Sequence, residues 1–187
     1  MGNFTLHTVE SSPAPSRDAM NAVGKKFGFI PNLIRELAAA PAAVNAYVTL
    51  NGIFDGTSLT PVERQIVLVT TSVENTCEYC VAAHTAGLKM AGLADDQIEA
   101  VRERRPLANP KLDALRRLTT AVVNNRGWIG DADLEAFLQA GYSREQVLEV
   151  LVGVAMKTLS NYANHIAQTP LDKQFEAFAW APAMTNA

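Results

Sequence analysis

Apolar residues recur every three or four positions along almost the whole chain, and this spacing predicts helices throughout. No segment shows the strict alternation typical of a strand. Glycine, proline and capping residues divide the pattern into predicted helices at 16–27, 31–40, 41–54, 60–75, 77–91, 95–104, 109–123 and 131–140, followed by a long helix from 143. The long helix is apolar around much of its circumference, so it is expected in the core or at an interface. The pattern predicts an all-α fold.

The chain divides into an irregular arm, residues 1–15, and a single helical domain, residues 16–187. The arm holds several serines and prolines and no helical pattern. The 187 residues suffice for one domain with a sizeable core, and no linker or repeat splits them. The aromatic tail after Pro170 carries Phe175, Phe178 and Trp180, which suggests docking, for instance on a neighbouring subunit.

Composition narrows the class of partner and the compartment. The net charge is −3 with no long basic run, which argues against nucleic acid or an anionic membrane as the main partner. The apolar stretch 147–156 is too short to span a bilayer, and residues 1–17 do not resemble a secretory signal. We therefore expect a cytoplasmic protein, in which a C-x-x-C pair is catalytic or metal-binding more often than a permanent disulfide.

The two cysteines of the chain form the C-x-x-C pair Cys77 and Cys80, and His84 follows four residues after the second. On a helix, at roughly 100° per residue, the three side chains share one face. A thiolate is the reactive form of cysteine, and a neighbouring imidazole can accept the thiol proton. One thiol could attack a peroxide and become a sulfenic acid, which the other would resolve to a disulfide.

Spacing alone leaves two other interpretations open. Apolar residues continue the same helical face, so the cysteines and His84 could simply be core. A metal site would need a fourth ligand, and the remaining histidines, His7 and His165, are far away in the sequence. We therefore predict no metal.

Four segments together resemble one known family, and they cover most of the chain from Gly28 to Asp172. The segments are Glu74–His84 (E-N-T-C-E-Y-C-V-A-A-H), Phe29–Leu33, Leu59–Arg64 and Asn161–Asp172. They resemble the AhpD-like (alkylhydroperoxidase D-like) branch of the carboxymuconolactone decarboxylase superfamily, and in particular its peroxidase-related members.

The resemblance implies an AhpD-like helical bundle that assembles as a homotrimer or homohexamer. It implies a cofactor-free thiol peroxidase, with Cys80 as the attacking cysteine, Cys77 as its resolving partner and His84 in the proton relay. The substrate would be a peroxide, and an external dithiol would regenerate the pair. Kinship with the superfamily also leaves open a carboxymuconolactone decarboxylase-type enzyme. A non-enzymatic metal-binding or redox-sensing oligomer is the third hypothesis.

One position departs from the pattern that the resemblance implies. Well-known family members place a glutamate twelve residues before the first cysteine, where this chain has Gln65, which cannot act as a base. Glu74 could replace it by facing the thiols, or it could be a solvated charge. Glu63 is expected to cap a helix instead. Tyr79, between the cysteines, could donate through its phenol or serve only in packing.

The remaining polar residues are expected to be structural. His165 forms a polar cluster with Asn161 and Asn164 near the end of the long helix, and such clusters are usually satisfied internally. His7 lies in the irregular arm and is expected to be exposed.

Overall fold

The computed structural model describes residues 4–182, and all regular secondary structure in that range is helical. The predicted all-α fold is confirmed. In chain order the helices are α1 (Arg17–Phe27), α2 (Asn32–Leu37), α3 (Pro41–Asp55), α4 (Pro61–Glu74), α5 (Glu78–Met90), α6 (Asp95–Arg102), α7 (Pro110–Asn124), α8 (Asp131–Gln139) and α9 (Arg144–Ala167), with short 3-10 helices η1 (Ala14–Ser16) and η2 (Lys173–Phe178).

Local sequence signals place most helix ends within a few residues of the prediction. The Thr60 hydroxyl accepts the Glu63 backbone N–H, and the Glu63 carboxylate accepts the Thr60 N–H, so a complete capping box opens α4. Ser143 and Gln146 form the same box at α9. Gly28 ends α1 with φ 79°, a left-handed conformation that favours glycine.

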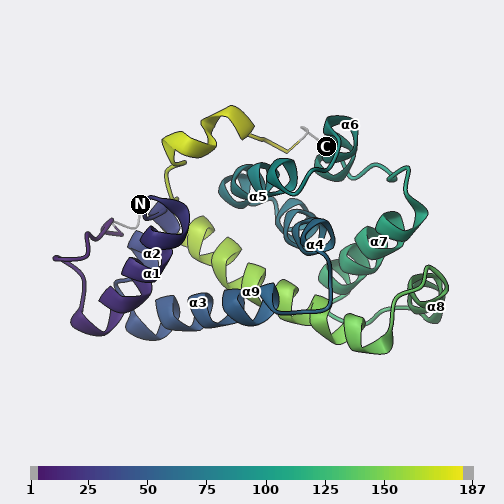
Figure 1. Ribbon diagram of the computed structural model, residues 1–187, viewed down its shortest axis with the longest axis horizontal. Helices are drawn as coiled ribbons and strands as arrows, with labels where there is room; N and C mark the ends of the chain where they lie inside the picture. Colours follow the sequence, from purple (N-terminus) through teal and green to yellow (C-terminus); the bar gives the residue numbers. More distant parts are fainter. Residues whose placement is uncertain (1–3, 183–187) are drawn as a thin grey trace.

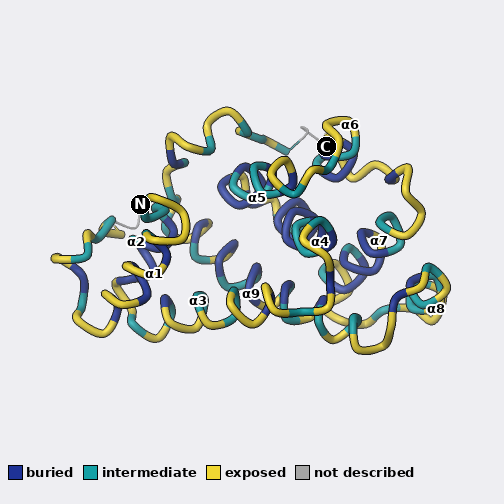
Figure 2. The backbone as a smooth tube through the Cα atoms, viewed as in Figure 1, coloured by how far each residue is buried: buried dark blue, intermediate teal, exposed yellow. Residues whose placement is uncertain are grey.

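Helix α4 lies at the centre of the molecule (Figure 1), packed against α5, α7 and α9. Helix α3 runs beside α9, α8 packs outside α7, and η2 covers α5. Burial follows this layout: in Figure 2 most of α4 is dark blue, with residues 66–73 all buried, whereas α3 and α8 expose their outer faces. The expected central long helix is α9, although one of its faces remains exposed.

Two clusters of buried apolar side chains make up the core. The larger one is built around α4, α6, α7 and α9, with Phe54 from the end of α3 and further residues from α5 and α8. Gly153 allows α9 to approach closely, because a Cβ there would lie 2.7 Å from Phe54 Cζ. The smaller cluster joins α1, α2 and α3 to the start of α5, and it contains both cysteines. The dithiol is thus embedded where the N-terminal helices meet α5.

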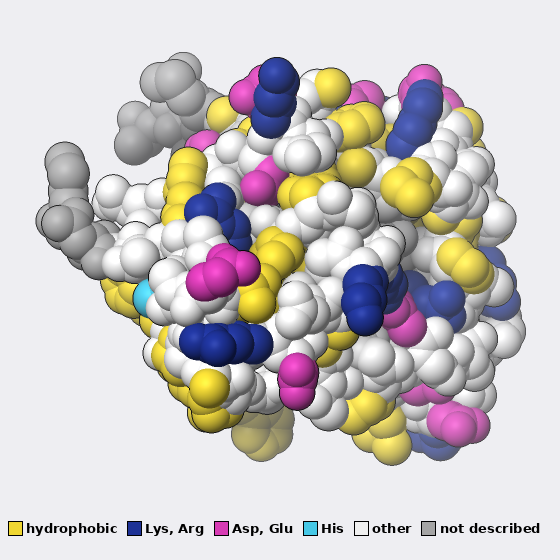
Figure 3. All heavy atoms as spheres, turned by 60° about the vertical axis from the view of Figure 1, so that its left-hand side comes forward, with side chains coloured by type: hydrophobic (Ala, Val, Ile, Leu, Met, Phe, Trp, Pro, Cys, Tyr) yellow, Lys and Arg dark blue, Asp and Glu magenta, His cyan; other side chains and the backbone are white. Residues whose placement is uncertain are grey.

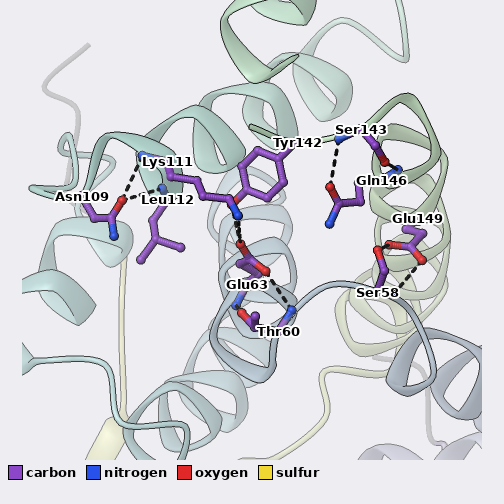
Figure 4. A network of polar contacts seen from close by, with 10 residues as sticks. All are labelled: Ser58, Thr60, Glu63, Asn109, Lys111, Leu112, Tyr142, Ser143, Gln146 and Glu149. Carbon is purple, nitrogen blue, oxygen red and sulfur yellow. Dashed lines mark hydrogen bonds and ion pairs between the residues drawn. The ribbon is translucent and has the colours of Figure 1, made fainter. Parts of the chain in front are cut away.

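A network of polar contacts fixes the end of α4 that lies far from the cysteines (Figure 4). The Tyr142 hydroxyl donates to Glu63 Oε1 at 2.9 Å, and Lys111 Nζ lies 3.5 Å from the same oxygen. Nearby, the Ser58 backbone N–H and hydroxyl each donate to the Glu149 carboxylate at 2.8 Å, tying the loop before α4 to α9. Glu63 is therefore the predicted cap and also the hub of an inter-helix contact.

Both chain ends that the structure describes are held by contacts within the chain. Arg35 on α2 donates to the backbone oxygens of Leu6 and His7, so His7 is half-buried rather than exposed as expected. Phe175 on η2 packs edge-to-face on Tyr79 and Phe29. Phe175 therefore packs within its own chain, on Phe29 in the loop before α2 and on Tyr79 of α5, and docking of the tail on a neighbouring subunit stays a prediction.

The surface shown in Figure 3 carries basic and acidic side chains interspersed, with hydrophobic ones between them. Among the described helices, none combines the length and the hydropathy that crossing a lipid bilayer requires.

Candidate functional site

The dithiol sits at the tight turn that joins α4 to α5. Cys77 is the N-cap residue of α5 and Cys80 lies in its first turn; both are free thiols and each is only 1% exposed. Thr76 takes φ 54° to make the turn, a left-handed conformation that is uncommon for a β-branched residue. The turn therefore places Cys77 at the helix start, where free backbone N–H groups face outward.

Helix α9 supplies the polar side chains that face the sulfurs. Asn164 Nδ2 donates to Cys80 Sγ at 3.1 Å and lies 3.7 Å from Cys77 Sγ. Ser160 Oγ lies 3.9 Å from Cys80 Sγ. Lys157, one turn earlier, is completely buried. Polar groups of three residues on one face of α9 thus line the side of the dithiol where apolar core side chains would otherwise pack.

His84 is held at both ring nitrogens. Its Nδ1 lies 3.1 Å from Gln65 Oε1 and donates to it, while its Nε2 accepts from Lys157 Nζ at 3.0 Å. Burial, together with the positive charge of Lys157, lowers the pKa of the His84 imidazole well below its ordinary value. His84 is therefore neutral, with its proton on Nδ1, and Gln65 fixes that tautomer.

The charges in the site favour a thiolate at Cys80. Burial alone would raise the pKa of Cys80, but a hydrogen bond from the Cys77 thiol and the Lys157 charge outweigh it, and the pKa is held well below its ordinary value. The hydrogen bond to Cys80 raises the pKa of the Cys77 thiol, as do its burial and the Cys80 charge. The Cys80 thiolate also keeps Lys157 protonated: burial would lower the pKa of that ammonium, but the neighbouring thiolate raises it.

Gly87 on α5 allows Gln65 to cross from α4 to His84. A Cβ at this glycine would lie 2.5 Å from Gln65 Oε1, closer than side chains tolerate. The absence of a side chain at Gly87 is therefore part of how His84 is positioned.

Glu74 does not take part in the site, so the suggestion that it replaces the relay carboxylate is wrong. Its carboxylate accepts from Thr120 and Asn124 on α7 and pairs with Arg104 at 3.3 Å. Glu74 lies near the end of α4 on the face that packs against α7, which is why it points away from the thiols.

Tyr79 has a structural partner. Its hydroxyl donates to Asp172 Oδ2 and accepts from the Leu33 backbone N–H at 3.4 Å. The same carboxylate accepts the Asn32 N–H at the start of α2, at 3.1 Å and 3.2 Å from its two oxygens. Tyr79 therefore connects α5, α2 and the segment after α9 beside the dithiol.

A cavity of about 650 Å³ opens onto Cys80, His84 and Lys157. Its walls are mainly apolar and come from α1 to α5, α9 and η2; they include Phe27, Val48, Leu68 and Phe175. Gln65, Tyr79 and Tyr47 also line it. The cavity can hold an organic molecule many times larger than hydrogen peroxide, with its reacting end against the Cys80 sulfur.

Sequence reasoning missed the contribution of α9. Lys157 is not among the predicted site residues, and Asn164 is predicted in a satisfied structural cluster, although its amide contacts both sulfurs. Asn161 does behave as expected, because it accepts from Asn75 Nδ2 at 3.0 Å and donates to Ser72. A signal existed in the spacing: Lys157, Ser160, Asn161 and Asn164 form a polar stripe on an otherwise apolar helix.

The described residues contain no group of three or more histidine, cysteine, aspartate or glutamate side chains arranged to hold a metal ion.

Comparison with known proteins agrees with this geometry. Residues 35–109, which include both cysteines and His84, match the carboxymuconolactone decarboxylase family. No curated protein sequence matches the chain at a significant level.

Several solved structures share the fold. A peroxidase-related protein with an alkylhydroperoxidase AhpD core, from Ralstonia eutropha JMP134, is 24% identical, with TM-score 0.83 over 96% of this chain and 97% of that one. A peroxidase-related protein from Silicibacter sp. TM1040 is 16% identical, with TM-score 0.75 over 93% and 92% of the two chains. The debrominase Bmp8, as its C82A variant with 2,3,4-tribromopyrrole, is 14% identical, with TM-score 0.76 over 95% and 96%. Residues 35–109 are therefore similar to the carboxymuconolactone decarboxylase family, and the chain shares its fold with AhpD-like, peroxidase-related proteins.

Proposed function

We propose that the protein is a thiol-dependent peroxidase that reduces organic hydroperoxides through a dithiol/disulfide cycle of Cys77 and Cys80. One observation carries the proposal: the Cys80 thiol, next to the buried ammonium of Lys157, lines an apolar cavity large enough for an organic substrate. A thiolate held in this way reacts with peroxides at neutral pH, where an ordinary thiol, with a pKa near ~8.5, is mostly protonated.

In the first step the Cys80 thiolate attacks the terminal oxygen of the hydroperoxide. The S–O bond forms, the O–O bond breaks, and the alkoxide leaves with the electron pair. Lys157 donates a proton to the alkoxide, which departs as an alcohol. Since His84 accepts from Lys157 Nζ at 3.0 Å, it holds the ammonium in place. With Lys157 as the proton donor, the reaction does not need a relay glutamate at the position that Gln65 occupies.

In the second step the Cys77 thiol attacks the sulfenic acid on Cys80. The S–S bond forms, the S–O bond breaks, and hydroxide leaves to combine with the Cys77 proton as water. Asn164, whose amide contacts both sulfurs, holds them side by side for this step. An external dithiol then reduces the disulfide and is itself oxidised to a disulfide.

The test is turnover of cumene hydroperoxide by the purified protein with dithiothreitol as reductant. Cys80→Ser should abolish turnover. In the absence of dithiothreitol, Cys77→Ser should reduce one equivalent of hydroperoxide and stop at the sulfenic acid on Cys80, which a sulfenic-acid probe detects. Wild-type rates in the Cys80→Ser variant would refute the proposal.

Reductive debromination is the competing activity to measure, because a debrominase shares the fold and the cavity here is apolar. If the protein releases bromide from 2,3,4-tribromopyrrole and does not reduce cumene hydroperoxide, the proposed substrate class is wrong. Cys80 would then remain the proposed nucleophile for debromination.

The predicted homotrimer or homohexamer is supported by an exposed apolar stripe on α9. Leu148, Leu151, Tyr162 and Ile166 are 64%, 40%, 55% and 66% exposed and lie within roughly 60° of the helix circumference. We expect light scattering to give a multiple of the 20.2 kDa chain mass, and Leu148→Glu to lower it. A cytoplasmic location remains the prediction, since a reducing compartment supplies the dithiol.

A further inference from the structure

We propose that the two sulfurs are reached through separate openings, so that the substrate approaches Cys80 from the apolar cavity and the external dithiol approaches Cys77 from a second depression. The proposal rests on the dithiol cycle proposed above and adds to it the place where the reductant acts.

Each of two hollows in the structure is lined by a different cysteine of the pair. The apolar cavity is lined by Cys80 and not by Cys77. A second, shallower depression of about 430 Å³ is lined by Cys77 and not by Cys80. Tyr79 lines both hollows, and its hydroxyl is anchored by Asp172, so its ring forms part of the wall between them.

The chemistry of the two linings also differs. Beside Cys77 the depression is built mostly from polar residues, namely Thr76, Glu78, Asn164, His165, Gln168 and Thr169. The imidazole of His165 is exposed at its rim. The cavity at Cys80 has mainly apolar walls. An apolar hydroperoxide therefore fits the first, and a polar thiol compound fits the second.

Asn164 provides an independent sign that a ligand enters the depression. Its side chain is only 4% exposed, and Oδ1 has no hydrogen-bond partner among the described residues, while Nδ2 contacts both sulfurs. A buried acceptor without a partner costs free energy, so such groups are rare outside functional sites. An incoming S–H, O–H or N–H donor beside Cys77 would satisfy this oxygen.

Attack at Cys77 also agrees with the charges at the two sulfurs. When a reductant thiolate attacks Cys77 Sγ, a new S–S bond forms and the Cys77–Cys80 bond breaks, with its electron pair passing to Cys80. Cys80 leaves as a thiolate next to Lys157, and thiols of low pKa leave faster. The second thiol of the reductant, once deprotonated, then attacks the reductant sulfur that is bonded to Cys77. The reductant closes its own disulfide, the bond to Cys77 breaks, and Cys77 takes up the proton.

The position of attack can be read directly with glutathione as a monothiol probe. Protein oxidised with diamide, which needs no peroxidase activity, is mixed with glutathione and quenched with iodoacetamide. Mass spectrometry with fragmentation then locates both modifications. We expect glutathione on Cys77 and carbamidomethyl on Cys80 in at least tenfold excess over the reverse. Equal labelling, or glutathione mainly on Cys80, would overturn the proposal. If the peroxidase assay fails, this readout still stands.

Two variants test the openings separately, with dithiothreitol reducing diamide-oxidised protein and cumene hydroperoxide oxidising reduced protein. His165→Trp narrows the depression and should slow reduction at least fivefold relative to oxidation. Ala86→Phe narrows the apolar cavity and should shift the same ratio at least fivefold in the opposite direction. Glu145→Trp, at an exposed position in the first turn of the same helix as His165 and outside both hollows, is the matched control. Parallel changes of both rates in the two variants would contradict separate access.

Discussion

Two of the charged groups that the protein buries, Glu63 and Lys157, behave in opposite ways. Glu63 at the start of α4 accepts from the Thr60 backbone N–H and the Tyr142 hydroxyl and lies 3.5 Å from Lys111 Nζ. Lys157 on α9 faces His84 Nε2 at 3.0 Å and lies next to Cys80. The first cluster joins α4, α7 and the loop before α9, and the second joins α9 to α5.

The difference lies in whether the partners of the buried charge can gain or lose a proton near neutral pH. Burial would raise the pKa of Glu63, but its hydrogen bonds with Thr60 and Tyr142 and the Lys111 charge hold it below its ordinary value, so the carboxylate stays ionised. The neighbours of Lys157 are an imidazole and a thiol, both able to gain or lose a proton. A buried charge with fixed partners stabilises the fold, whereas one with titratable partners can support proton transfer.

Among the substitutions that test this difference, Lys157→Met should have the largest effect on activity. The methionine fills similar space without charge, so Cys80 loses the group that stabilises its thiolate. We expect kcat/KM for cumene hydroperoxide at pH 7 to fall roughly 10²–10³-fold, since each pKa unit changes the thiolate fraction about tenfold. The melting temperature should fall only modestly: removing one partner of a buried ion pair is destabilising, but the Cys80 thiol can take up a proton, so no unpaired charge is left buried.

Lys111→Met is the matched control at the other cluster. This lysine is about half exposed and lies over the Tyr142 ring at 4.6 Å. Its removal should change stability by less than about 1 kcal/mol and leave kcat/KM within twofold. Equal losses of activity in the two lysine variants would remove the distinction between the clusters.

Glu63→Ala should have the opposite effect to Lys157→Met, lowering stability and leaving activity nearly unchanged. It removes the capping box of α4 and leaves the buried Tyr142 hydroxyl without its acceptor. We expect the free energy of unfolding to fall by about 2–3 kcal/mol in urea denaturation. The rate with cumene hydroperoxide should remain within twofold of wild type in the folded protein. A tenfold loss of activity without loss of stability would contradict a structural role.

Gly87→Ala is a finer change within the second cluster. The added Cβ must displace Gln65, which then no longer fixes the His84 tautomer. We expect kcat/KM to fall about 3–10-fold with little change in stability. Gly130→Ala, where nothing lies within 4 Å of the added Cβ, is the control and should leave activity unaltered. Wild-type kinetics in Gly87→Ala would show that the Gln65 contact is dispensable.

Local chemistry explains which parts of the molecule could be predicted from the sequence. The capping residues Thr60 and Ser143 and the left-handed Gly28 determine helix ends through neighbouring residues, so the helices were predictable. The face shared by Cys80 and His84 follows from helical spacing. The direction of Glu74 and the approach of Lys157 depend on how distant helices pack, which no local pattern determines. The packing of Phe175 on Tyr79 depends on distant segments in the same way.

The central claim is that Lys157 holds Cys80 as a thiolate at neutral pH. The most direct test is the rate of iodoacetamide alkylation of Cys80 against pH, followed by mass spectrometry in wild type and Lys157→Met. The lowered pKa means that the thiolate persists as pH falls, so the wild-type midpoint should lie well below ~8.5. The midpoint of the variant should lie at or above that value. A midpoint near ~8.5 in both proteins would contradict the account.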